Sequence, residues 1–264
     1  MPDDSIGKIV KVSLAVCVVC AVLVSAAAVS LNGIQLKNQQ LDKIKNILIA
    51  GDLYQKGQDI GKTYDEKVTP VMLELETGSV LSEDQFTGDL NIRDFDINAM
   101  SKSSEYGKDI SGNDPIQVKR VPKYMVIYQV KSGEALDKII LPIFGKGLWS
   151  TLYGFVALGS DLKTIRGLTF YDHKETPGLG GEVDNPRWKE QWKGKEAFGD
   201  DWNVVISVLK GKVNAGSPQA IHQVDGLSGA TLTTRGVDYL VKYWLGEDGY
   251  GPYLSKLRAG GQHG

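Results

Sequence analysis

The segment Asp225–Thr234, DGLSGATLTT, places four hydroxyl groups, two glycines and one carboxylate directly before an apolar, helix-like run. Its residues admit two interpretations. In the structural one, the glycines form turns and Thr231, Thr233 or Thr234 caps the helix that follows. In the chemical one, N–H groups at the helix start hold a phosphate, which Gly229 allows to approach and which a threonine hydroxyl carries as an ester.

A serine nucleophile of the α/β-hydrolase type does not fit the same segment. Residues 226–230 read GLSGA, whereas the nucleophile elbow of those enzymes is G-x-S-x-G, with the second glycine one position later. We therefore expect no hydrolase chemistry at Ser228.

A second segment, YDHKETPGLGGEV at Tyr171–Val183, follows a strand-like run and contains the glycines and proline of a tight, ligand-approaching loop. His173 and Glu175 raise the question of a metal, but the pattern is not H-E-x-x-H, and His222 and His263 are isolated. We predict no metal site here; the alternative to a metal site is a surface turn with a solvated histidine.

A third segment, GKGLWSTLYG at Gly145–Gly154, sets Trp149 beside flexible glycines. An indole in such a place either stacks on a planar ring or packs in the core. The residues alone leave both interpretations open.

Together with one apolar N-terminal span, the segments GKGLWSTLYGFVAL, GLTFYDHKETPGLGGEV and VDGLSGATLTTRGV resemble the FMN-binding domain shared by the C subunit of the Na⁺-translocating NADH:quinone reductase and the G subunit of Rnf complexes. The resemblance covers the span and roughly the C-terminal half, and residues 57–114 contribute little. Within this family, the length of 264 residues and the long stretch before the first clear strand are closer to the quinone reductase member.

The resemblance implies a covalent cofactor and the residues that hold it. The last threonine of the S/T-G-A-T motif, Thr231, would carry FMN as a phosphoester installed by a flavin transferase that draws on FAD. The other motif members are Ser228, Gly229 and Ala230. The flavin would be lined by Leu148, Trp149, Glu175, Thr176, Gly178, Leu179 and Gly180.

The family also implies a function and a location. The chain would relay electrons from NADH toward quinone inside a multi-subunit membrane complex coupled to Na⁺ translocation, without catalytic residues of its own. Its main domain would lie on the periplasmic side of a bacterial inner membrane. Three alternatives are a G-type Rnf subunit, an extracellular redox domain of another respiratory chain, and a noncatalytic membrane-anchored ligand-binding module.

The elements that must position these motifs are mostly strands. Turn residues separate five strand-like runs, and the closing run has its apolar residues on one helical face with Gly246 as a C-cap. This order predicts an α+β domain with a mainly antiparallel sheet flanked by helices. The runs are Tyr124–Val130, Lys138–Gly145, Leu148–Leu158, Thr164–His173 and Asn203–Leu209, and a further short helix is expected near Leu81–Phe86.

The N-terminal run Val12–Leu31 has 20 residues without a charge or a proline, which as a helix matches a hydrocarbon core of about 30 Å. We predict a membrane anchor, since a cleaved signal peptide usually has a shorter apolar region. Lysines on both sides of the run leave its orientation open. Cys17 and Cys20, the only cysteines, either pack as small apolar side chains or share a metal with a partner subunit.

The resulting division is a cytoplasmic tail (1–11), a transmembrane helix (12–32), a membrane-proximal helical and irregular region (33–120) and an FMN-binding domain (121–264). A helix ending at Gly51 is expected to lead away from the membrane. The balance of 30 basic and 32 acidic residues lacks the excess of positive charge that marks a nucleic-acid-binding protein, so no nucleic-acid partner is expected.

Overall fold

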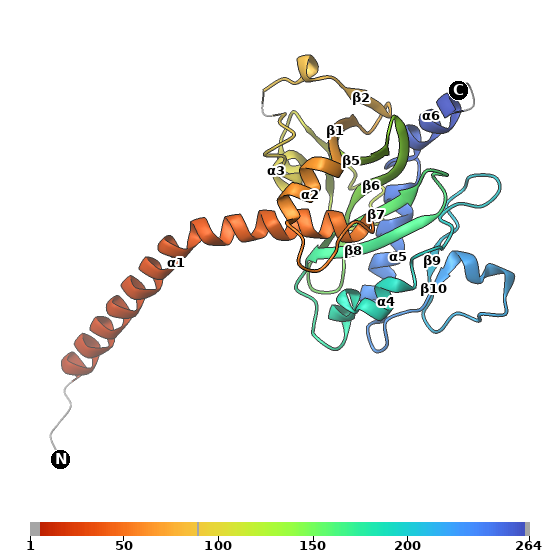
Figure 1. Ribbon diagram of the computed structural model, residues 1–264. Helices are drawn as coiled ribbons and strands as arrows, with labels where there is room; N and C mark the ends of the chain where they lie inside the picture. Colours follow the sequence, from red (N-terminus) through yellow and green to blue (C-terminus); the bar gives the residue numbers. More distant parts are fainter. Residues whose placement is uncertain (1–5, 89, 262–264) are drawn as a thin grey trace. The chain divides into compact units, whose positions relative to one another are not determined.

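The computed structural model describes residues 6–88 and 90–261. It divides into two compact units, residues 1–43 and 44–264. The helices are α1 (Ile6–Ala50), α2 (Ile60–Lys67), α3 (Ile97–Lys102), α4 (Pro186–Glu190), α5 (Thr231–Leu245) and α6 (Gly251–Gly261), with short 3₁₀ turns at Glu83–Gln85 (η1), Gly180–Asp184 (η2) and Pro218–His222 (η3) (Figure 1). The strands are β1 (Val68–Glu74), β2 (Ser79–Leu81), β3 (Gly107–Asp109), β4 (Arg120–Pro122), β5 (Tyr124–Ser132), β6 (Ala135–Lys146), β7 (Thr151–Gly159), β8 (Ile165–Asp172), β9 (Ser207–Val208) and β10 (Gln223–Val224).

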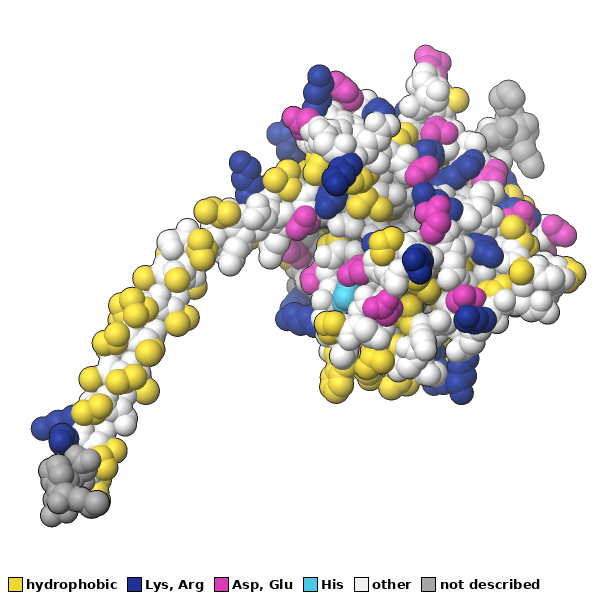
Figure 2. Space-filling view, turned by 60° about the horizontal axis from the view of Figure 1, so that its bottom comes forward, with side chains coloured by type: hydrophobic (Ala, Val, Ile, Leu, Met, Phe, Trp, Pro, Cys, Tyr) yellow, Lys and Arg dark blue, Asp and Glu magenta, His cyan; other side chains and the backbone are white. Residues whose placement is uncertain are grey.

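Within the described residues, the first unit is the N-terminal part of α1, residues 6–43. This helix is long and apolar enough to cross a membrane, and the side chains of its apolar stretch are exposed. Figure 2 shows apolar side chains along this arm of the chain. Because no protein surface covers them, a hydrocarbon environment is the one that these side chains match.

The second unit is built on a six-stranded antiparallel sheet with the order β2-β1-β5-β6-β7-β8. Strands β5 to β8 are consecutive in the chain and joined by short turns, so the sheet is a meander at this edge. The β5–β6 hairpin turns at Gly133, whose φ of 65° is a conformation that glycine adopts without a Cβ clash. The prediction of a mainly antiparallel sheet with helices is confirmed.

Alternate residues of the sheet face different helices, as the pleat requires. Gly145 of β6 lies against Leu240 of α5, and Gln129 of β5 bonds the Tyr253 hydroxyl of α6 at 2.9 Å. On the opposite face, Ile140 and Gly167 lie against the chain at the end of α1. The sheet is therefore the middle layer of this unit.

Helix α5 is fixed on the sheet by apolar contacts and by one buried indole. Val237, Leu240, Val241 and Trp244 are at most 1% exposed, as the predicted helical face requires. Trp244 Nε1 donates to the Phe144 carbonyl at 2.7 Å, and Gly246 occupies the C-cap as expected. The C-terminal half of α5 is thereby held against β6.

Several sequence-based expectations need correction. Residues 68–81 form strands β1 and β2, which were not predicted, and α6 was not predicted either. The helix expected near Leu81–Phe86 is a single 3₁₀ turn, Glu83–Gln85. The strand expected at Asn203–Leu209 is reduced to Ser207–Val208, because Val205 N and Ile206 N both donate to the Ala197 carbonyl. The helix expected to end at Gly51 is confirmed and is continuous with the anchor helix.

Candidate flavin site

One buried carboxylate organises the site. Glu175, 5% exposed, accepts hydrogen bonds from the backbone N–H groups of Leu148, Trp149 and Ser150 at 2.9–3.2 Å. It also accepts the Thr233 hydroxyl of α5 at 2.6 Å. The carboxylate therefore joins the loop before β7, the loop after β8 and the first turn of α5.

These hydrogen bonds also set the charge of Glu175. Burial alone would raise the pKa of its carboxyl, but the bonds from Thr233 and from three backbone N–H groups outweigh burial and hold the pKa below its usual value. Glu175 is an anion at neutral pH, with both oxygens engaged by protein donors.

Glycines make this close packing feasible. A Cβ at Gly147 would lie 2.6 Å from Glu175 Oε1, and one at Gly180 would lie 2.5 Å from Thr233 Oγ1 and 2.6 Å from Glu175 Oε2. Gly178, with φ of 75°, forms the turn in the loop that contains Gly180. The glycines of the predicted ligand loop thus serve first to bring its backbone against α5.

The segment before α5 presents a threonine at the helix start. Gly229 has φ of 72°, Ala230 is the N-cap and Thr231 is the first helical residue, with an exposed side chain. The expectation of a threonine cap is wrong: the methyl side chain of Ala230 accepts nothing, so the N–H groups of the first turn are left for another acceptor. Thr234 instead accepts the Leu227 N–H at 3.0 Å, which fixes the preceding turn.

The segments that meet at this helix start carry exposed apolar side chains. Trp149 is 66% exposed, so the core interpretation of this residue is wrong. Leu148, Leu179 and Leu232 are 39%, 44% and 53% exposed, and a Cβ at Gly229 would lie 2.9 Å from Leu179. Figure 2 shows apolar side chains gathered at the lower edge of the globular unit, while charges of both signs are interspersed elsewhere on this face.

The structure brings the three predicted segments together. Leu148 and Trp149 meet Glu175 through hydrogen bonds, and Leu179 and Gly180 lie against Gly229 and Thr233. Thr176 accepts hydrogen bonds from Leu179 and Gly181 through its carbonyl, which closes the loop around Gly178. Ser228 and Gly229 are exposed, and Ala230 is buried beneath them.

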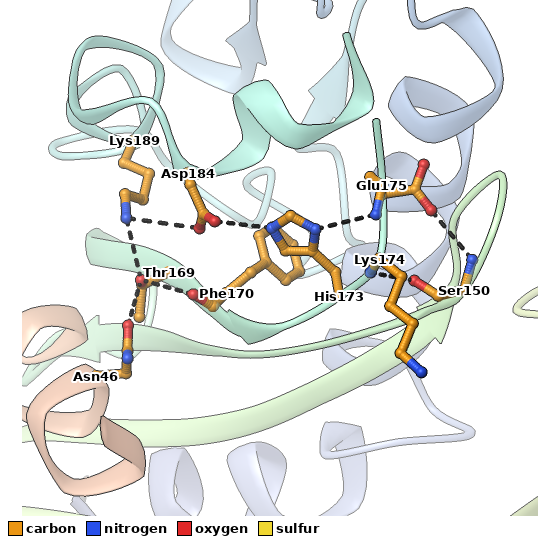
Figure 3. A network of polar contacts seen from close by, with 9 residues as sticks. All are labelled: Asn46, Ser150, Thr169, Phe170, His173, Lys174, Glu175, Asp184 and Lys189. Carbon is orange, nitrogen blue, oxygen red and sulfur yellow. Dashed lines mark hydrogen bonds and ion pairs between the residues drawn. The ribbon is translucent and has the colours of Figure 1, made fainter. Parts of the chain in front are cut away.

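Sequence reasoning missed the second set of contacts that shape the site (Figure 3). His173 is bonded to Asp184 rather than solvated, with 2.8 Å between Nε2 and Oδ2, and Ser150 Oγ accepts the Lys174 N–H at 2.7 Å. A histidine and an aspartate eleven residues apart in a loop carry no periodic signal. Of the other histidines, His222 bonds the Glu196 carbonyl, and His263 lies outside the described residues.

Comparison with known proteins identifies the family. The family model described as an FMN-binding domain matches residues 147–246, which include two segments of the site in full and the third from Gly147 onward. The chain is 43% identical to the C subunit of the Na⁺-translocating NADH-quinone reductase of Yersinia pestis, over 98% of this chain and 95% of that protein. Identity to the protein of the same name from Pseudomonas aeruginosa is 40%, over 98% of both chains.

The chain belongs to the family of the NqrC proteins, the C subunits of Na⁺-translocating NADH-quinone reductases. The crystal structure of NqrC from Shewanella oneidensis is 33% identical and superposes with a TM-score of 0.74, over 83% of this chain and 98% of that one. A crystal structure of the corresponding protein from Parabacteroides distasonis gives 25% identity and a TM-score of 0.63, over 85% and 97%. The resemblance to this family and the predicted FMN-binding fold are confirmed.

Proposed function

We propose that the chain is an electron-transfer subunit of a Na⁺-translocating NADH-quinone reductase and that it carries FMN as a phosphoester on Thr231. The observation that carries the proposal is the position of Thr231, exposed on the first turn of a 15-residue helix inside the matched FMN-binding domain. Family membership supports the electron-transfer role.

The residues around Thr231 fit a phosphate. The first-turn N–H groups of α5 lack intrahelical acceptors, and the positive end of the helix dipole favours an anion beside them. Gly229 leaves the approach free of a Cβ, and Ser228 adds an exposed hydroxyl next to it. These groups would hold a phosphate that is attached at Thr231.

The surrounding side chains fit a planar aromatic ring. Trp149, Leu148, Leu179 and Leu232 present apolar surface to solvent near the same helix start. Rings of this size are bound by apolar and aromatic contacts, and FMN supplies one- and two-electron transfer when bound. Because a covalent ester prevents dissociation, the ring need not be enclosed, and one edge stays accessible to electron-transfer partners.

Maturation would require a flavin transferase. In that reaction Thr231 Oγ1 would form a bond to the flavin-side phosphorus of FAD as the phosphoanhydride bond breaks, with AMP as the leaving group and release of the hydroxyl proton. Exposure of Thr231 suits access by such an enzyme. We further propose that the anchor lies in a bacterial inner membrane with residues 1–11 cytoplasmic, residues 33–264 periplasmic and the flavin facing other subunits.

The attachment site is tested by exchanging single hydroxyls. We expect Thr231→Ala to fold but to show no flavin fluorescence comigrating with the band on a denaturing gel, whereas Ser228→Ala keeps it. The wild-type peptide that contains Thr231 should gain the mass of FMN less one water. Covalent FMN in the Thr231→Ala chain would contradict the assignment, and a wild-type chain that stays colourless beside an active transferase would favour a noncatalytic module.

A further inference from the structure

His173 stands at the start of the loop that carries Glu175, and its side chain is only 12% exposed. Its two ring nitrogens have different partners (Figure 3). Nε2 lies 2.8 Å from the Asp184 Oδ2, and Nδ1 accepts the backbone N–H of Glu175 at 3.2 Å. The imidazole thus bridges η2 and the peptide from which the Glu175 side chain extends.

These partners determine where the imidazole carries its proton. A carboxylate only accepts, so Nε2 carries the hydrogen shared with Asp184. A backbone N–H only donates, so Nδ1 must keep its lone pair. The observed contacts therefore require the neutral Nε2–H tautomer of His173.

Asp184 faces Lys189 of α4, which is linked through β8 to the last turns of α1. Lys189 Nζ lies 3.9 Å from Asp184 Oδ1 and 3.4 Å from the Thr169 hydroxyl, and that hydroxyl donates to Asn46 Oδ1 at 2.8 Å. The partner of the imidazole is thus set by contacts that do not involve the site's own loops.

We propose that His173 is a positioning residue of the flavin site, which holds the Glu175 peptide through Nδ1 so that the Glu175 carboxylate keeps the Leu148–Ser150 loop against α5. The consequence for the flavin rests on the proposed function, whereas the contacts of His173 and Glu175 are made within the protein and need no flavin. His173 acts through Glu175 and is not itself a cofactor ligand.

Protonation of His173 should release this contact. The charged groups that face the ring are Asp184 from η2, Asp172 at the end of β8 and the Glu175 carboxylate, with Lys189 of α4 beyond Asp184. The hydrogen bond to Asp184 raises the pKa of His173 against the opposing effect of burial. As the pH falls through this pKa, the ring gains charge attraction to Asp184 but loses the Nδ1 lone pair that accepts the Glu175 N–H.

Two substitutions distinguish the roles of the two ring nitrogens. In His173→Asn, the amide oxygen replaces Nδ1 as an acceptor for Glu175 N–H, while the contact to Asp184 is lost. In His173→Gln, the amide nitrogen reproduces the donor to Asp184, while the acceptor for Glu175 is lost. Each variant is the matched control of the other.

The readout is amide hydrogen exchange of the full-length chain in detergent, followed at the Leu148, Trp149 and Ser150 amides. At pH 8 we expect exchange in His173→Gln to be about three- to tenfold faster than in wild type, the effect of one lost hydrogen bond, and in His173→Asn to be close to wild type. Protection in wild type should fall between pH 8 and pH 5.5, after correction for intrinsic rates, and should stay constant in His173→Asn. Equal protection in both variants at every pH would overturn the proposal.

Running the same comparison in the Thr231→Ala background keeps the two proposals apart. The exchange difference between the Asn and Gln variants should persist there, because it needs no flavin. If Thr231→Ala retained covalent FMN, the attachment site would be wrong while the role of His173 stood. If wild type carried flavin on Thr231 but the Asn and Gln variants showed no difference in exchange in the Thr231→Ala background, the role of His173 would be wrong while the attachment site stood.

Discussion

At Glu175, one buried carboxylate joins segments that lie 25 to 58 residues away along the chain. Charge-assisted hydrogen bonds are shorter and stronger than neutral ones, and a buried anion without them would be costly. The side chain was expected to line the flavin by family resemblance. Its contacts show a further role, since its oxygens already bond the backbone of the Trp149 loop and Thr233.

Replacing Glu175 with glutamine should destabilise the globular unit. The amide keeps the shape but turns one acceptor into a donor that faces a backbone N–H or the Thr233 hydroxyl. We expect a loss of about 2 kcal/mol in the free energy of unfolding, measured by urea denaturation. Glu134→Gln, at an exposed turn position, is the control and should change it by less than about 0.5 kcal/mol; equal effects would contradict the clamp role.

The same carboxylate should make stability depend on acid pH. Because the folded-state pKa of Glu175 is lowered, its contribution is present above the unfolded value near 4.5 and is lost as the pH falls through the folded value. The stability difference between wild type and Glu175→Gln should therefore shrink below about pH 4.5. Urea denaturation at pH 7 and at progressively lower pH measures this, and a difference that stayed constant would show that charge is not its origin.

Among the elements, the position of α5 depends on one close contact between its backbone and the end of β6. A Cβ at Gly236 would lie 2.3 Å from the Lys146 carbonyl, so only glycine lets the helix lie against the end of β6. The same helix carries Thr233 three residues earlier and Thr231 five residues earlier, so its position on β6 also sets their position.

Gly236→Ala should therefore push α5 away from β6. Since the clash is with backbone rather than with a flexible side chain, we expect the free energy of unfolding to fall by about 2 kcal/mol or more. The hydrogen bond between Thr233 and Glu175 should weaken as α5 moves. Gly260→Ala in α6, where a Cβ meets no atom within 4 Å, is the matched control and should be neutral or stabilising by up to about 1 kcal/mol. Thermal unfolding of both variants measures the difference; similar melting temperatures would refute the packing argument.

The elements also show what sequence patterns can reveal. Strands β5 to β8 were predicted because their apolar, β-branched runs are bounded by turn residues. Strand β1 was missed since Pro70 and the charged Glu74 interrupt a short apolar run, and its pairing with β5 and β2 makes it a strand. The site segments were predicted from motifs, whereas the His173–Asp184 contact depends on how η2 folds back, which no local pattern encodes.

At the scale of the whole molecule, α1 serves two units. Residues up to 43 form one compact unit, whereas Ile47, Leu48 and Ala50 are at most 1% exposed and belong to the core of the second. A single helix thus contains an apolar stretch fit for a membrane and a final segment that the globular fold requires.

This division predicts different outcomes for two truncations. Removing residues 1–43 should leave a folded, soluble globular unit, because it removes the exposed apolar stretch and no residue of the buried core. Removing residues 1–51 should destabilise that unit by several kcal/mol, since burial of Ile47 and Leu48 alone contributes about 1.5–3 kcal/mol each. The point variant Ile47→Ala in the shorter truncation should cost about 2–5 kcal/mol and separates loss of packing from loss of chain length. The free energy of unfolding of the three proteins is measured by urea denaturation. Equal values would show that the last turns of α1 belong to the anchor alone. A stepwise decrease from the 1–43 truncation to its Ile47→Ala variant and to the 1–51 truncation would show that the flavin domain begins inside the helix.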